Sequence, residues 1–173
     1  MLILHPYLPG HREDEQAPTW RLLEQAARTW PVHDIDLSWD HLYGYGASLR
    51  ALWGTPGVDW LIVEHDVEAT LADVEAMAKC PELLCTAPYG HSGHVAQDLA
   101  GYQVMATSLG FTRITARARE MCGDWPVPAG VTYRLLDSYL SAALASAVLS
   151  RTGRAWHPHP PVVHHHAAVG SGA

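Results

Sequence analysis

Short apolar runs alternate with longer amphipathic segments in the first half of the chain. Runs rich in Val, Ile, Leu and Trp, bounded by Gly, Pro or Asp, are typical of buried strands. These strands are predicted at 2–7, 32–37, 60–64 and 83–87. Apolar residues at helical spacing predict helices at 18–28, 47–53 and 68–79. The alternation indicates βαβ units, and therefore an α/β fold with a mostly parallel, Rossmann-like sheet flanked by helices.

The second half of the chain has a different pattern. Residues 89–101 are rich in Gly, His and Ser and are interpreted as an active-site loop. Extended segments are expected within 104–114 and 155–166, and helices at 115–121 and 133–150. With no internal repeat and no boundary signal, residues 1–167 are expected to form a single domain, followed by a flexible tail at 168–173.

The run Trp60-Leu61-Ile62-Val63 ends abruptly in Glu64-His65-Asp66. If the strand continues, its alternation points the side chains of Glu64 and Asp66 the same way. Ligands of open α/β sheets bind beyond the carboxyl ends of the strands. Two carboxylates that face the same way repel each other, so a divalent cation carrying a phosphorylated substrate is expected between them. The alternative is that Asp66 caps a helix starting near Glu68 and that Glu64 is solvated.

Composition and charge narrow the class of function. A net charge of −7 argues against broad electrostatic binding to nucleic acid, and no apolar run is long enough to cross a membrane. The N-terminal residues lack the pattern of a secretion signal, and a cytoplasmic location is expected. Cys80, Cys85 and Cys122 are odd in number and lack paired zinc spacing, so free buried thiols are expected. Histidine is the outlier, with 12 residues.

Four local features, in this order, resemble a compact glycosyltransferase of the GT-A type. The acidic group Glu64-His65-Asp66 stands where that family has its Asp-x-Asp motif. The segment 108–114, which contains Gly110, is similar to the strand that lines the donor sugar. Asp137 is at the start of the last long helix, where inverting members keep a catalytic acidic residue, and 164–166 is a histidine run near the C-terminus.

The resemblance implies a nucleoside-diphosphate sugar as donor and Mn²⁺ or Mg²⁺ as cofactor. Asp66 would bind the ion directly, and Glu64 would bind it through water or hold the ribose. His164 or His166 would complete the shell, and an imidazole ligand favours Mn²⁺. Asp137 would act as general base on the acceptor hydroxyl and give inversion at the anomeric carbon; the alternative is that it stabilises the helix dipole.

The same resemblance implies that the nucleoside lies at the ends of the first two strands. Pro6 and Tyr7 would flank the base, and either Asp34 or Asp36 would bind it, with Asp36 preferred. Arg50 is a candidate for the diphosphate. Arg113 is a second one, although surface placement is expected for both arginines. Trp125 and Tyr133 are candidate platforms for the acceptor, or core residues.

The chain departs from the family pattern in two places. Its acidic motif is Glu-His-Asp, and Leu136 rather than a second carboxylate precedes Asp137. The acceptor is therefore left open among a glycan, a small molecule and a modified nucleic acid, and so is the oligomeric state. Two other functions stay in view. One is a zinc hydrolase that uses the His91/His94, His157/His159 and His164/His166 pairs. The other is a non-catalytic nucleotide-sugar-binding module.

Overall fold

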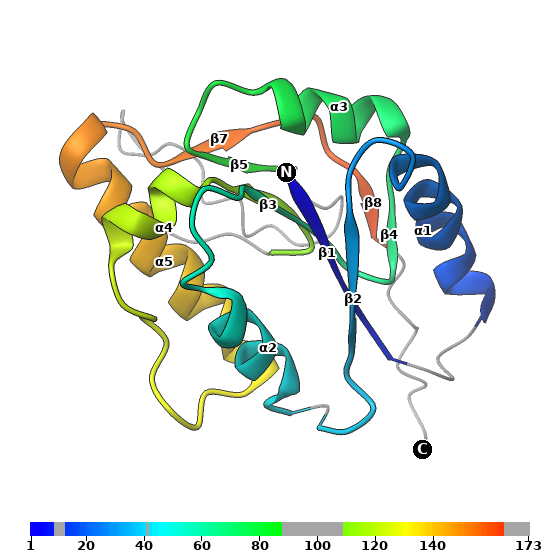
Figure 1. Ribbon diagram of the computed structural model, residues 1–173, viewed down its shortest axis with the longest axis horizontal. Helices are drawn as coiled ribbons and strands as arrows, with labels where there is room; N and C mark the ends of the chain where they lie inside the picture. The colour runs from blue at the N-terminus through cyan, green and yellow to red at the C-terminus, as the bar shows by residue number, and fades with distance from the viewer. Residues whose placement is uncertain (9–12, 41, 88–108, 165–173) are drawn as a thin grey trace, which may run out of the picture.

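The protein is an α/β structure built on one six-stranded sheet (Figure 1). The structure is a computed structural model and describes residues 1–8, 13–40, 42–87 and 109–164. Only the backbone is described at 13–16 and at 164. The strands lie in the order β2-β1-β3-β6-β5-β7. Their bounds are β1 Leu2–Tyr7, β2 Val32–Asp36, β3 Trp60–Val63, β5 Leu84–Thr86, β6 Phe111–Ile114 and β7 Trp156–Pro158.

The strand order reverses beside β1. From β1 the chain passes through α1 (Glu13–Ala26) to β2 on one side, and from β2 through α2 (Gly44–Leu52) to β3 on the other. β1 pairs in parallel with both neighbours, so the carboxyl ends of β1, β2 and β3 meet at one edge of the sheet. In open α/β sheets, ligands bind outside the carboxyl ends of the two strands at such a reversal, which are β1 and β3 here.

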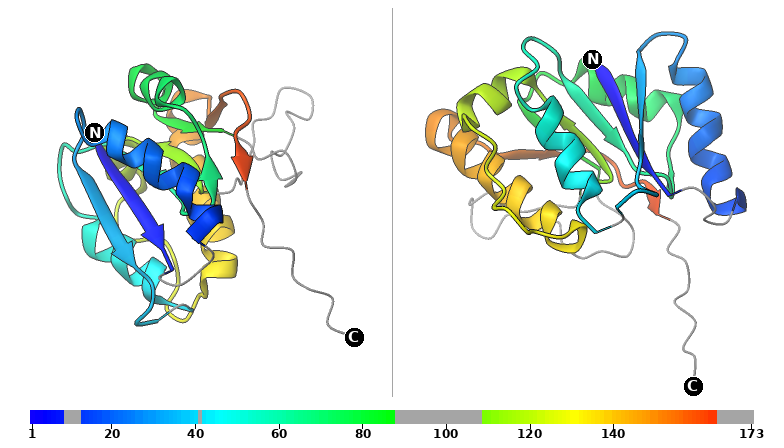
Figure 2. Two further views of the ribbon diagram at one scale, coloured as in Figure 1. Left: turned by 90° about the vertical axis from the view of Figure 1, so that its right-hand side faces the viewer. Right: turned by 60° about the horizontal axis from the view of Figure 1, so that its bottom comes forward.

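Helices cover both faces of the sheet (Figure 2). One face packs against α2, α4 (Ala116–Cys122) and α5 (Tyr133–Thr152), with Leu49, Leu136 and Leu140 among the buried residues. The other face packs against α1 and α3 (Leu71–Lys79), with Leu22 and Val74 in its core. Residues alternate between the two cores along β1, where Ile3 faces one and Leu4 the other, as the period of a strand requires.

The prediction of a mostly parallel sheet is only partly correct. The β1–β2, β1–β3 and β5–β7 pairs are parallel, but β6 runs antiparallel to both β3 and β5. The sheet is therefore mixed. No helix signal separates β5 from β6 in the sequence, and an antiparallel return needs no crossover helix, so periodicity alone did not reveal the reversal.

Three helix predictions needed correction at their starts. The helix predicted from 47 begins at Gly44, within the turn expected at 43–46. The helix predicted from 68 begins at Leu71, because Thr70 is its N-cap: the Thr70 side chain accepts from the Asp73 amide, and Asp73 accepts in return. Asp66 therefore does not cap this helix. The helix predicted from Pro18 begins at Glu13 and keeps Pro18 inside it. Its first residues are acidic, which favours a helix N-terminus.

The expected extended segment after α5 forms two short strands. β7 adds to the edge of the main sheet beside β5. β8 (Val163–His164) pairs antiparallel with β4 (Val67–Glu68) in a separate two-stranded sheet. The C-terminal segment therefore returns to the chain that follows β3. The predicted tail at 168–173 lies outside the described residues.

Candidate active site

The acidic motif forms a turn rather than the end of a strand. β3 ends at Val63, and the amide of Val67 donates to the carbonyl of Glu64 over 3.2 Å, which closes the turn. The strand-alternation argument for the directions of Glu64 and Asp66 therefore does not apply. Both residues are half-buried, and the Oδ1 atom of Asp66 is buried from solvent. The turn stands at the carboxyl end of β3, next to the reversal of strand order.

A buried threonine of α1 fixes this acidic turn. Thr19 is completely buried, and its hydroxyl lies 2.9 Å from the carbonyl oxygen of His65 and 2.6 Å from that of Val67. The two carbonyls sit on either side of Asp66. Because the Thr19 hydroxyl bonds to carbonyls of the residues before and after Asp66, the backbone around Asp66 is held in a defined position relative to α1.

Asp137 and Glu64 are connected through two consecutive residues. The Leu109 amide donates to Oδ2 of Asp137 over 3.3 Å, and the Gly110 carbonyl accepts from the Glu64 amide over 2.8 Å. Gly110 immediately precedes β6, which is followed by α4, as predicted from the sequence. The segment Leu109–Gly110 thus lies between the candidate base and the acidic turn.

The histidine run reaches the same neighbourhood through its backbone. His164 is the register partner of Val67 in the β4–β8 pair, one residue beyond Asp66. His166 lies outside the described residues. A carboxylate and an imidazole together would form a donor set that suits Mn²⁺. Among the described side chains, no third acidic, His or Cys ligand atom lies close to both Glu64 and Asp66. A metal site at this turn would therefore need a ligand from residues 164–166.

Tyr7 and Asp36 are register partners at the ends of β1 and β2. Asp36 is exposed, and hydrogen bonds from the Ser38 hydroxyl and amide hold the pKa of Asp36 below its ordinary value. It is therefore an ionised acceptor at the site edge. Asp34 instead accepts from Nδ1 of buried His5 at 3.0 Å, which leaves Asp36 as the better placed of the two. Pro6 is buried, and its register partner on β2 is Ile35, which lies between Asp34 and Asp36.

An aromatic cluster supports the end of β1. The ring of His5 stacks on Tyr7 at 5.5 Å between centroids, and Trp20 of α1 contacts both rings edge-on. Burial lowers the pKa of His5, although Asp34 opposes the shift. Tyr7 is thus positioned by its neighbours rather than projecting alone at the edge.

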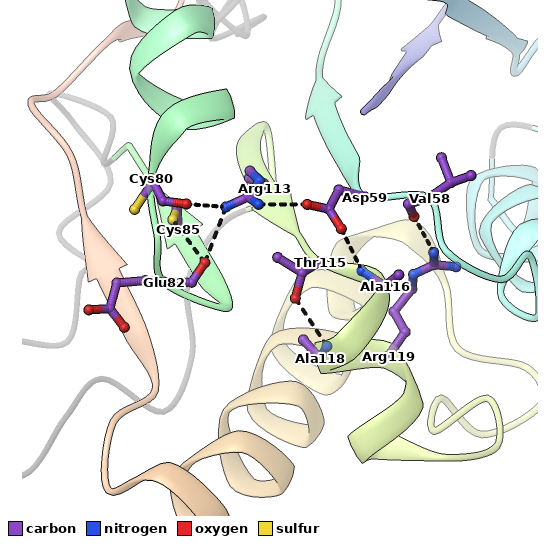
Figure 3. A network of polar contacts seen from close by, with 10 residues as sticks. All are labelled: Val58, Asp59, Cys80, Glu82, Cys85, Arg113, Thr115, Ala116, Ala118 and Arg119. Atoms are coloured by element: carbon purple, nitrogen blue, oxygen red, sulfur yellow. Dashed lines mark hydrogen bonds and ion pairs between the residues drawn. The ribbon is translucent and has the colours of Figure 1, made fainter.

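The two arginines considered for the diphosphate lie elsewhere. Arg50 is exposed in the last turn of α2, at the end that leads to β3, whereas the site is at the edge where α2 begins. Arg113 was expected at the surface but is buried. Its guanidinium donates to the Asp59 carboxylate at 2.6 Å and to the carbonyls of Cys80 and Glu82 (Figure 3). Both terminal nitrogens of Arg113 are therefore already hydrogen-bonded within the fold.

Exposed aromatic residues near the start of α5 form a feature that sequence reasoning identified only in part. Tyr133 is exposed, and its amide donates to the Leu42 carbonyl, which joins α5 to the segment before α2. Trp39 and Tyr43 on that segment are also exposed. Asp137 is one helical turn beyond Tyr133 on the same helix face, so the Tyr133 side chain lies on the side of α5 that carries the candidate base. Trp125 is instead packed against Trp53.

A surface pocket of about 150 Å³ lies at the other edge of the sheet. It is lined by Trp53, Thr55 and Arg119, among others. Arg119 donates to the carbonyls of Trp53, Thr55 and Val58 and lies over the Trp60 ring at 3.9 Å. Among the described residues that line this pocket, Arg119 is the only cationic one, and its guanidinium is committed to the loop before β3.

One cluster of potential metal ligands was not predicted from the sequence. Cys80, Cys85 and His159 come together although no spacing in the sequence connects them.

No protein-family model matches the chain, and no curated protein is significantly similar to it. Within the described part of the chain, no helix is long and apolar enough to span a membrane.

Proposed function

We propose that this protein is a metal-dependent glycosyltransferase that moves a sugar from a nucleoside-diphosphate sugar to an acceptor hydroxyl. The observation that carries the proposal is the meeting of the acidic turn, the ends of β1 and β2, and Asp137 at one edge of the sheet, beside the reversal of strand order. In open α/β sheets this is where nucleotides bind.

The donor would lie across the carboxyl ends of β1, β2 and β3. Tyr7 offers a ring face, and ionised Asp36 accepts hydrogen bonds from the base or ribose. Asp66, Glu64 and one residue of the 164–166 run would hold Mn²⁺ or Mg²⁺. When bound, such an ion neutralises the diphosphate and stabilises it as a leaving group. Thr19 would keep Asp66 in place for this role.

Asp137 would accept the proton of the acceptor hydroxyl as that oxygen attacks the anomeric carbon. A single displacement of this kind inverts the anomeric centre. The exposed rings of Tyr133, Trp39 and Tyr43 offer apolar faces on which an acceptor sugar or other ring would stack. These rings favour a glycan or a small glycosylated molecule, and the net charge of −7 disfavours nucleic acid.

Release of nucleoside diphosphate tests the proposal. A panel of sugar nucleotides would be incubated with Mn²⁺ and simple sugars as acceptors, and the diphosphate would be quantified. We expect release from one donor with the unaltered protein and with Asp124→Asn, which changes an exposed carboxylate elsewhere. Asp66→Ala and Asp137→Asn should abolish it. Equal release by Asp66→Ala would contradict the assignment of the acidic turn.

A further inference from the structure

Cys80, Cys85 and His159 bring their ligand atoms within 4.8 Å of one another. Cys80 is the C-cap of α3, Cys85 lies in the middle of β5, and His159 follows β7. Both cysteines are buried free thiols, and His159 is half-buried. Three ligand side chains from three separate parts of the fold therefore converge below α3, on the face of the sheet opposite α5.

The backbone fixes each of these residues. The amide of His159 donates to the Thr86 carbonyl over 2.8 Å, which extends the β5–β7 pairing past Pro158. Arg113 donates to the carbonyl of Cys80 over 2.9 Å, and Figure 3 shows Cys80 and Cys85 next to this arginine. The main chain therefore fixes the positions of Cys80 and His159.

The His159 ring and the Cys85 sulfur differ in their partners. Nε2 of His159 is buried and has no hydrogen-bond partner among the described residues. The Cys85 sulfur lies 3.9 Å from the Glu82 carbonyl and also interacts with the side chains of Cys80 and Arg113. A buried imidazole nitrogen without a partner is costly in a folded protein, and a bound ion would satisfy it.

We infer that Cys80, Cys85 and His159 form a zinc site that ties α3, β5 and the end of β7 together. Two thiolates and one imidazole are ligands that select zinc over magnesium or manganese. Ligand atoms about 2.3 Å from a tetrahedral ion lie about 3.8 Å apart, so the cluster needs to contract by at most about 1 Å. Two thiolates would balance the charge of the ion. Because burial raises the pKa of the Cys85 thiol, the ion would have to displace its proton on binding.

The fourth position is open to water or to His157. That exposed side chain is the register partner of Cys85, and its ring lies 5.2 Å from the ring of His159. Bound zinc would anchor the segment that runs from β7 into β8, and hence the strand that carries His164 to the acidic turn. The zinc site does not depend on the proposed transferase activity.

Cobalt and zinc binding to the reduced full chain test the inference. The chain has three cysteines, so Cys122→Ser leaves only the two of the cluster. We expect this variant and the unaltered protein to bind Co²⁺ with sulfur-to-cobalt charge-transfer absorption. X-ray absorption at the zinc edge should then give two sulfur ligands. His159→Gln should weaken zinc binding by more than the 10- to 100-fold typical of losing an outer-shell partner.

Two results would overturn the inference, and neither needs a variant of a buried cysteine. One is cobalt or zinc bound by Cys122→Ser with only oxygen and nitrogen ligands. The other is reduced, unaltered protein whose zinc affinity equals that of His159→Gln.

Discussion

The backbone amide of Leu109 donates to Oδ2 of Asp137 over 3.3 Å. This bond joins the first turns of α5 to the residue before Gly110, whose carbonyl in turn holds the amide of Glu64. The candidate base and the acidic turn therefore share one short connecting segment. A carboxylate that only stabilised the helix dipole would not need this contact with a distant strand.

Asp137→Asn separates the chemical role of this residue from its structural one. Asparagine keeps an oxygen that accepts from Leu109 but cannot take up the acceptor proton. We expect the transfer rate to fall roughly 10²- to 10⁴-fold, with the melting temperature unchanged. Rates and thermal unfolding should be compared with those of Asp124→Asn. A variant that keeps full activity would show that Asp137 is not the base.

Thr19→Val tests how the acidic turn is positioned. The substitution keeps the shape of the side chain but removes the hydroxyl that bonds to the carbonyls of His65 and Val67. We expect about 1–3 kcal/mol less stability and an affinity for Mn²⁺ with nucleotide that is roughly tenfold weaker. Thr19→Ser keeps the hydroxyl and should bind normally. If Thr19→Val binds as tightly as Thr19→Ser, the hydroxyl does not position the metal ligands.

Arg113 and Arg117 form a matched pair for stability. Arg113 is buried and bonds to Asp59 and two carbonyls, whereas Arg117 pairs with Glu120 at the surface of α4. Arg113→Met should lower the free energy of unfolding by about 2–4 kcal/mol, because it leaves buried acceptors unpaired. Arg117→Met should change it by less than about 1 kcal/mol. Urea unfolding of both variants checks the difference; equal losses would be inconsistent with the network in Figure 3.

The buried His5 gives a pH dependence of known sign. It is fully buried among Tyr7, Trp20 and Asp34, and burial lowers its pKa from 6.5. The unfolded chain therefore binds a proton that the folded one does not. The contribution of neutral His5 is complete above pH 6.5 and is lost as the pH falls toward the folded pKa, by at most about 1.4 kcal/mol per pH unit.

His5→Asn keeps a donor to Asp34 but cannot titrate, so it isolates this term from the other histidines. We expect the stability of the unaltered protein, relative to His5→Asn, to decline as the pH falls below 6.5. The free energy of unfolding of both proteins should be measured between pH 5 and 8. A difference in the free energy of unfolding that is constant over this range would mean that folding does not change the pKa of His5.

The first three strands and the helices between them were predictable from the sequence, because local apolar periodicity dominates there. The turn at 64–67 was not. An apolar run followed by Glu64-His65-Asp66 does not reveal where the strand ends, and β4 depends on its pairing with β8, which lies far along the chain. The start of α3 was within reach, since Thr70 and Asp73 form a capping box that outweighs the apolar pattern.

The candidate site was predictable only where it follows directly from strand ends. Asp36 and the acidic turn follow strands, so their shared edge could be inferred from a parallel sheet. The Leu109–Asp137 bond and the Cys80–Cys85–His159 cluster could not be inferred, since they depend on the antiparallel β6 and on the edge position of β7. Long-range pairing of this kind leaves no periodic signal in a single sequence.

Calorimetric titration with nucleoside diphosphates tests the central claim most directly. Uridine, guanosine, adenosine, cytidine and thymidine diphosphates would each be titrated into the protein with Mn²⁺ and in a metal-free buffer without chelator, which leaves any bound zinc in place. The account predicts that one nucleotide binds, only with Mn²⁺, to the unaltered protein and to Asp124→Ala but not to Asp66→Ala. Binding that is equal without Mn²⁺ or in Asp66→Ala, or no binding by any nucleotide, would contradict it.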